Sequence, residues 1–130
     1  SDNVIRAGLT SKHMDVDLLC DILDQEMQPM LISPEYQRFE WGTLAIYKTP
    51  AREFRLEYFE TNSDASSSPI AIASKGPKIL LCIKGSFRLC TREQIELSAR
   101  KSCFIAGSCE KIELRGQGKL WLATVGEIDT

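Results

Sequence analysis

Residues 79–90 read ILLCIKGSFRLC, and this stretch decides the fold class. Two short apolar segments, 79–83 and 87–90, flank the tripeptide Lys84-Gly85-Ser86, and glycine suits a tight turn. Short apolar runs that are bounded by turn residues are typical of β-strands. The stretch therefore predicts two strands joined by a turn.

The sequence on both sides continues this pattern. Toward the C-terminus four further strands are predicted, at 95–97, 103–105, 111–114 and 120–125. Toward the N-terminus, apolar and polar residues alternate at 44–47 and 54–58, as in half-buried strands, with Leu56 in the apolar phase. The glycines fall at the ends of predicted strands, which places them in turns, at 85, 107, 116 and 118. Frequent short strands predict a mainly β fold, an antiparallel sandwich or barrel, with Trp41 and Trp121 packed in its core.

The first 40 residues follow a different pattern. Apolar residues at 4, 5, 7 and 9 predict a short strand. Asp15 can cap a helix, because the apolar residues after it recur with helical spacing, at Val16, Leu19, Cys20 and Leu23. That helix is expected to end near residue 24 or 25. Two prolines follow, so residues 26–40 are predicted to form an irregular connector between two bodies.

Composition excludes several classes of function. The 130 residues are 43% apolar, which is enough for one globular core. Sixteen Lys and Arg against eighteen Asp and Glu give a net charge of −2, without the positive excess of a nucleic-acid-binding protein. No run of eighteen apolar residues occurs, and the polar start does not resemble a targeting segment, so no membrane partner is expected.

Cysteine and histidine content limits the chemistry further. The five cysteines are an odd number without a C-x-x-C pair, and they are predicted to be reduced, mostly buried thiols of a cytoplasmic protein. His13 is the single histidine and is expected at the surface, where it cannot build a zinc site alone. No Ser-His-Asp set or Gly-rich phosphate loop is present. The residues alone thus indicate a β-rich domain without a recognisable catalytic set.

The opening of the chain carries a resemblance. Residues 1–12 read SDNVIRAGLTSK. This segment resembles the SDNVxRAGLTPK signature of type I, zinc-dependent mannose-6-phosphate isomerases, and the later segments LEYFE, ILLCIKG and CFIAG resemble that family's C-terminal domain. The resemblance implies that residues 1–12 end a catalytic cupin domain, that 13–40 form a helix and connector, and that 41–130 form a metal-free, cupin-like jelly roll. We therefore interpret the chain as the C-terminal portion of a longer protein.

The resemblance also implies an activity for the longer protein. In the family, a zinc-binding cupin domain interconverts mannose 6-phosphate and fructose 6-phosphate by proton transfer through an enediol. Its zinc ligands are expected upstream of this chain, which is then expected to bind no zinc and to be inactive alone. The implied partners are the sugar phosphate and the upstream catalytic domain of the same polypeptide. In residues 105–110, IAGSCE, the histidine of metal-binding cupins is replaced by Glu110, which is expected to be a solvated turn residue.

Two residues of the motif are candidate site residues. Arg6 matches the arginine of the family's RAG motif, and the resemblance implies a catalytic role. A guanidinium stays protonated, and its fork of donors can hold two oxygens as negative charge builds on an enediolate. Without the motif, Arg6 would be read as pointing to solvent. Lys12 matches the lysine of the family's TPK and is a candidate substrate-binding residue, although a solvated lysine at the helix end is the alternative. Ser11 replaces the proline of that tripeptide.

Two other functions compete with the isomerase interpretation. A stand-alone, metal-free cupin would act as a small-molecule or protein-binding module. A scaffold or dimerisation domain would carry a large exposed apolar face and would have no affinity for sugar phosphates.

Overall fold

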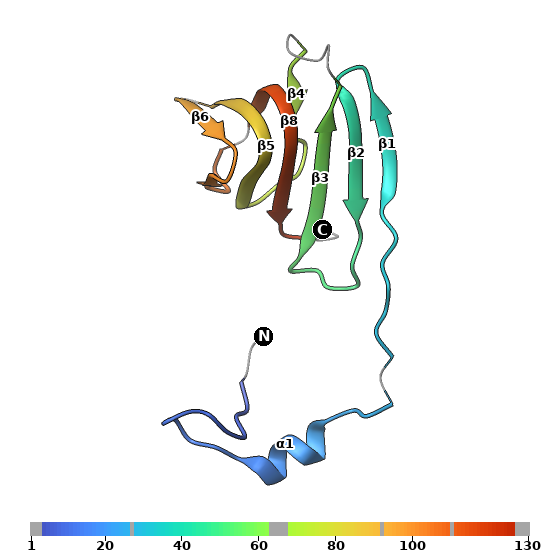
Figure 1. Ribbon diagram of the computed structural model, residues 1–130, viewed down its shortest axis with the longest axis vertical. Helices are drawn as coiled ribbons and strands as arrows, with labels where there is room; N and C mark the ends of the chain where they lie inside the picture. The colour runs from blue at the N-terminus through green and yellow to red at the C-terminus, as the bar shows by residue number, and fades with distance from the viewer. Residues whose placement is uncertain (1–3, 27, 63–67, 92, 110, 127–130) are drawn as a thin grey trace. The chain divides into compact units, whose positions relative to one another are not determined.

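The structure is a computed structural model that describes residues 4–26, 28–62, 68–91, 93–109 and 111–126 (Figure 1). It forms two compact units, residues 1–31 and residues 32–130. The first contains helix α1, Val16–Ile22. The second contains the strands β1 Glu35–Phe39, β2 Gly42–Tyr47, β3 Arg55–Thr61, β4 Ile70–Ala71, β5 Lys78–Cys90, β6 Gln94–Ser98, β7 Ser102–Ile105 and β8 Glu113–Thr124. Within the described ranges, no helix is long and apolar enough to cross a membrane.

The predicted helix is confirmed, and its first turn explains where it begins. Asp15 is the N-cap, and its side-chain Oδ1 accepts a hydrogen bond from the backbone N–H of Leu18 at 2.9 Å. The helix ends at Ile22, before the predicted end. The strand predicted over residues 4–9 is wrong. This segment pairs with no described strand, and the chain bends at Gly8 and Leu9, where the φ of Leu9 is 54°.

The strands of the second unit pair antiparallel throughout, in the order β1-β2-β3-β8-β5-β6, with β4 added to β8 and β7 added to β5. The irregular connector predicted for residues 26–40 is wrong at its C-terminal end, because Glu35–Phe39 pair with β2 as a regular edge strand. The sequence does not predict β1, because its five residues are all exposed and therefore show no alternation of buried and exposed positions.

Strands β5 and β8 are the longest, and they pair over almost their whole lengths. The turns predicted at 84–86 and 115–118 are therefore wrong, since both segments continue through the sheet. A register shift between Cys82 and Lys84 interrupts the ladder. Just beyond it, Gly85 faces Gly118 across the two strands, with φ values of 83° and 143°. These glycines mark a bend within the strands, not a chain reversal.

The bend gives β5 and β8 two halves that belong to different parts of the sheet. The first half of β5 pairs with β7 and with the end of β8, which also pairs with β3. The second half of β5 pairs with β6 and with the start of β8, which also pairs with β4. Buried residues from both halves form one core, which includes Trp41, Phe59, Ile70, Leu80, Phe87, Leu89, Leu97, Leu114, Leu120 and Leu122. The prediction that Trp41 packs in the core is confirmed.

The opposite side of the sheet carries apolar residues as well. Strand register places them in two rows that cross the sheet, Tyr36-Ala45-Tyr58-Trp121-Leu81 and Tyr47-Leu56-Ala123-Ile79-Phe104. We call these ten residues the outer apolar face. Tyr36 is 69% exposed, Ile79 is 52% exposed and Phe104 is 68% exposed. Trp121 contacts Tyr47 and Tyr58 on this face, so its predicted place in the core is wrong.

The close approach of β5 and β8 predicts a specific sensitivity to substitution. A Cβ atom at residue 118 would overlap the carbonyl oxygen of Lys84, and the backbone there has a φ that favours glycine. We expect Gly118→Ala to lower the free energy of unfolding by about 3 kcal/mol, measured by urea denaturation. Gly8→Ala is the control, because nothing lies within 4 Å of its added Cβ. Equal unfolding midpoints for the two variants would contradict the role of the bend.

Candidate functional site

The structure places the two predicted site residues on the segment that precedes α1. Arg6 is half-buried, and its backbone carbonyl accepts a hydrogen bond from the N–H of Asp15 at 3.0 Å. Among the described residues, its guanidinium has no hydrogen-bond or ion-pair partner. Lys12 is exposed, and its backbone N–H donates to Thr10 Oγ1 at 3.1 Å. The bond between Arg6 and Asp15 ties the RAG motif to the start of the helix.

The apolar residues around this motif are not buried within their own unit. Helix α1 has no buried residue, and Val16 and Leu18 are 50% and 44% exposed. Leu9, in the motif itself, is fully exposed. A helix of seven residues is only marginally stable in water unless an apolar face packs against something else. The first unit therefore presents an apolar surface that its own described residues do not cover.

The described residues do not fit a zinc ion. No group of three or more His, Cys, Asp or Glu in the described ranges is placed to hold a metal. His13 is exposed, as predicted, and so is Cys20, which the sequence had placed on the buried face of the helix. Glu110, the position of the missing cupin histidine, lies outside the described residues. Among the described residues, no set of side chains is therefore arranged to hold zinc.

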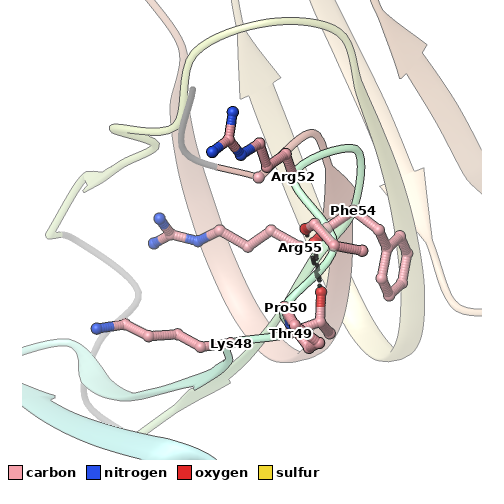
Figure 2. Close-up of a pocket in the computed structure, with 8 residues that line it drawn as sticks. Lys48, Thr49, Pro50, Arg52, Phe54 and Arg55 are labelled. Atoms are coloured by element: carbon pink, nitrogen blue, oxygen red, sulfur yellow. Dashed lines mark hydrogen bonds between the residues drawn. The ribbon is translucent and has the colours of Figure 1, made fainter. Parts of the chain in front are cut away.

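One small cavity, of about 140 Å³, lies at the loop between β2 and β3, and three cationic side chains line it (Figure 2). Lys48, Arg52 and Arg55 extend in the same direction from the hairpin (Figure 2). Such a group could attract an anion, but Lys48 pairs with Glu35 at 3.1 Å, and Arg55 pairs with a carboxylate of its own strand. Because two of the three cations are paired and the volume is small, this loop is a poor phosphate site.

A larger cavity, of about 510 Å³, opens on the inner side of β1, β2 and β3. Its lining residues are Gln37, Phe39, Trp41, Leu44, Ile46, Arg55, Glu57, Phe59, Pro69, Ala71, Ala73 and Ser74. Three of them form a ladder of rings. Trp41 stacks on Phe39 at 5.0 Å between centroids and on Phe59 at 5.8 Å. This cavity has the volume of a small-molecule site and an aromatic wall.

A buried carboxylate lines the same cavity, and the charge of a buried ammonium acts on it. Glu57 is 4% exposed, and one of its carboxylate oxygens is 2.8 Å from the guanidinium of Arg55. Burial raises the pKa of Glu57, although Arg55 and Lys78 oppose that shift. Lys78 is 2% exposed, and its ammonium donates to the carbonyl of Gly76 at 2.6 Å. Burial lowers the pKa of Lys78, against the opposing effects of Cys109 and Glu57.

This polar group could not be predicted from the sequence, because the alternation in β3 indicates the wrong buried phase. It places Leu56 in the buried phase and thereby turns Glu57 outward. In the structure, Glu57 and Phe59 face the core side, whereas Leu56 and Tyr58 lie on the outer apolar face. A signal was present, since Phe59 continues the phase of Glu57 and is as apolar as its neighbours. Both faces of β3 carry apolar residues, so alternation alone could not choose between them.

Comparisons with known proteins show that the chain is similar to mannose-6-phosphate isomerases. Mannose-6-phosphate isomerase 1 of Arabidopsis thaliana is 31% identical over an alignment of 132 positions, which covers 97% of this chain and 28% of that protein. The mannose-6-phosphate isomerase of Escherichia coli K12 is 30% identical over 124 residues, 92% of this chain and 30% of that protein. A probable mannose-6-phosphate isomerase of Dictyostelium discoideum is 36% identical over 91 residues, 68% of this chain and 20% of that protein. No family model matches the chain.

The chain belongs to the mannose-6-phosphate isomerase family. The family predicted from the resemblance of the sequence is thus confirmed. The chain spans between a fifth and a third of the length of the curated isomerases that it matches.

Solved isomerase structures confirm the predicted fold class. The Salmonella typhimurium mannose 6-phosphate isomerase bound to fructose 6-phosphate and zinc superposes with a TM-score of 0.70 at 22% identity, over 96% of this chain and 31% of that one. The apo form of the same enzyme gives the same values. The second unit is therefore a mainly antiparallel, cupin-like β-domain, as the isomerase resemblance implied.

The buried carboxyl of Glu57 predicts a pH effect on stability. Its pKa in the folded chain lies above 4.5, the ordinary value that applies to the unfolded chain. At a pH between the two pKa values, the folded chain therefore binds more protons at Glu57 than the unfolded chain does. Its contribution to the free energy of unfolding therefore falls as the pH rises above 4.5, by at most about 1.4 kcal/mol per pH unit. Glu57→Gln removes this titration. In urea denaturation at increasing pH, we expect the free energy of unfolding of the wild type to fall relative to that of Glu57→Gln. If the two free energies change with pH in the same way, the buried placement of Glu57 is contradicted.

Proposed function

We propose that this chain is the C-terminal portion of a cytoplasmic, zinc-dependent mannose-6-phosphate isomerase that interconverts mannose 6-phosphate and fructose 6-phosphate. The observation that carries the proposal is the RAG motif, held by the hydrogen bond between Arg6 and Asp15 next to apolar residues that lack a core of their own. The isomerase relatives, which are about three times as long or longer, support it. Zinc and its ligands belong to the upstream catalytic domain in this proposal.

Arg6 is the residue of this chain that we assign to the chemistry. Its guanidinium keeps its charge at any relevant pH and has no partner among the described residues, so it is available to a substrate. During proton transfer between neighbouring carbons, negative charge moves onto two adjacent oxygens. A planar guanidinium can donate to both at once, whereas a lysine ammonium offers a single point charge. Lys12 is exposed six residues away in sequence, and we propose that it attracts the phosphate group.

The same proposal accounts for the two uncovered apolar surfaces. Helix α1 exposes Val16 and Leu18, and four residues of the outer apolar face are exposed, namely Tyr36, Ile79, Leu81 and Phe104. Sheet faces that remain in water normally carry polar residues. We propose that the upstream part of the isomerase polypeptide covers both surfaces, since the relatives contain the additional length that this requires.

Two alternatives remain for the second unit. The stand-alone binding module is favoured by the 510 Å³ cavity, which has its own polar groups. The dimerisation domain is favoured by the outer apolar face, because a second copy could cover it instead. Both alternatives predict that Arg6 has no effect on catalysis, so the isomerase assay separates them from the proposal.

A substitution of Arg6 tests the assigned role. In the complete isomerase polypeptide we expect Arg6→Ala to lower kcat/KM by about 10²- to 10³-fold, because electrostatic stabilisation of this kind contributes about 3–4 kcal/mol. Arg6→Lys should recover only part of this loss, and neither variant should change the unfolding midpoint. The control is Arg38→Ala, an exposed arginine on β1. In a coupled enzyme assay of the isomerisation, the 130-residue chain alone should give no turnover. A loss below about tenfold would count against the role of Arg6.

Covering of the outer apolar face can be measured by hydroxyl-radical footprinting. Leu81 is 38% exposed on this face, and Ile95, on β6, is also 38% exposed. We expect Leu81 and Phe104 to be oxidised more slowly in the complete polypeptide than in the 130-residue chain, while Ile95 reacts equally in both. Leu81 and Phe104 could instead become equally protected from oxidation in the 130-residue chain when its concentration rises. If sedimentation then shows a dimer, a second copy covers the face.

A further inference from the structure

The 510 Å³ cavity of the second unit is a candidate ligand site in its own right. Its lining contains neither Arg6 nor Lys12, and it draws on four segments of the β-domain. From the side chains that line it, we infer that this cavity binds a small, neutral, hydroxylated ring of monosaccharide size. The inference is independent of the proposed isomerase activity, because no residue of the RAG motif takes part.

The aromatic wall gives the cavity an apolar platform. Trp41 lies between Phe39 and Phe59 in one stack, with interplanar angles of 8° and 27°. Trp41 and Phe59 are buried, and their positions are thus fixed by the core, whereas Phe39 is 45% exposed and keeps open surface. A ring with C–H groups on its faces can pack on such a surface, which is the apolar half of sugar recognition.

The polar groups of the cavity suit hydroxyl groups better than an ion. Arg55 and Glu57 form an ion pair whose charges cancel, so the pair offers both donors and acceptors without net charge. A carboxylate ligand would meet Glu57, and an ammonium ligand would meet Arg55. A hydroxyl group can donate to Glu57 and accept from Arg55 at the same time. Gln37 adds an amide, which also donates and accepts.

Ser74 supplies the observation that points most directly to a ligand. Its hydroxyl oxygen is buried and has no hydrogen-bond partner in the described structure, although it lines the cavity. Buried polar groups in folded proteins are normally paired, because an unpaired one costs about 1–3 kcal/mol. A ligand hydroxyl placed between Ser74 and the ion pair would remove this cost. The neighbouring wall is formed by Ala71 and Ala73, whose small side chains leave the volume open.

Lys78 is not among the groups that a ligand meets in the cavity. It is 2% exposed and does not line the cavity, although its charge acts on Glu57. Its ammonium donates to the carbonyl of Gly76. The groups that a ligand can reach are therefore the Arg55–Glu57 pair, the amide of Gln37 and the hydroxyl of Ser74.

Tryptophan fluorescence provides a direct test. The chain has two tryptophans, and Trp121 lies on the outer apolar face, so Trp121→Phe leaves Trp41 as a reporter at the cavity. We expect D-mannose and D-glucose to change the Trp41 emission saturably, with dissociation constants of about 1 mM. Mannose 6-phosphate and cyclohexane carboxylate should bind at least tenfold more weakly. Equal or tighter binding of the charged probes, or a response that does not saturate, would overturn the inference.

Matched variants locate the binding. Ser74→Ala should weaken D-mannose binding about fivefold, the expected loss for one hydrogen bond, and Glu57→Gln should weaken it further. Ser102→Ala is the control, since Ser102 is exposed on β7 outside the cavity. Arg6→Ala should also leave the titration unchanged, which separates this inference from the isomerase proposal. If Trp121→Phe does not fold, methyl NMR shifts of Ile46 in the wild-type chain report on the same cavity. Unaltered affinity in Ser74→Ala and Glu57→Gln would contradict the site.

Discussion

The ladder between β5 and β8 is the interaction on which the β-domain depends. Each strand belongs to both halves of the fold, so every other strand is joined to the domain directly or indirectly through this pair. The ladder can serve both halves only because it bends, and it bends where Gly85 and Gly118 face each other with backbones too close for side chains. Hydrophobic core formation follows from this geometry, since the bend brings Leu80 and Leu122 to the same core as Phe87 and Leu114.

The strand content of the sequence was readable because short apolar runs mark strands independently of their partners. What the runs could not show was continuity. A glycine between two apolar runs predicts a turn by local chemistry, yet Gly85 and Gly118 lie inside long strands because their conformations are set by each other. The edge strand β1 was missed for the opposite reason, since it buries nothing and so shows no pattern. Tertiary pairing decided both cases.

One candidate site could be predicted from the sequence and the other could not. Arg6 was found through a motif, and the structure adds that its backbone is held by Asp15 while its guanidinium has no partner among the described residues. The Arg55–Glu57 pair could not be found, because polar residues on an alternating strand are assigned outward by default. Its burial is costly unless another interaction offsets it, so its place inside the domain calls for a functional explanation. The ligand that we infer for the cavity beside it would use both charges of the pair.

The exposed edge strand has a consequence for how the domain behaves in concentrated solution. β1 is the last strand of the sheet, and its outer backbone donors and acceptors have no strand beside them among the described residues. Such an edge is a template for strands of other molecules and a starting point for aggregation. Charged side chains interrupt it, namely Glu35, which pairs with Lys48, and Arg38. Their charges disfavour the stacking of identical edges, so the domain resists ordered assembly without a covering element at this side.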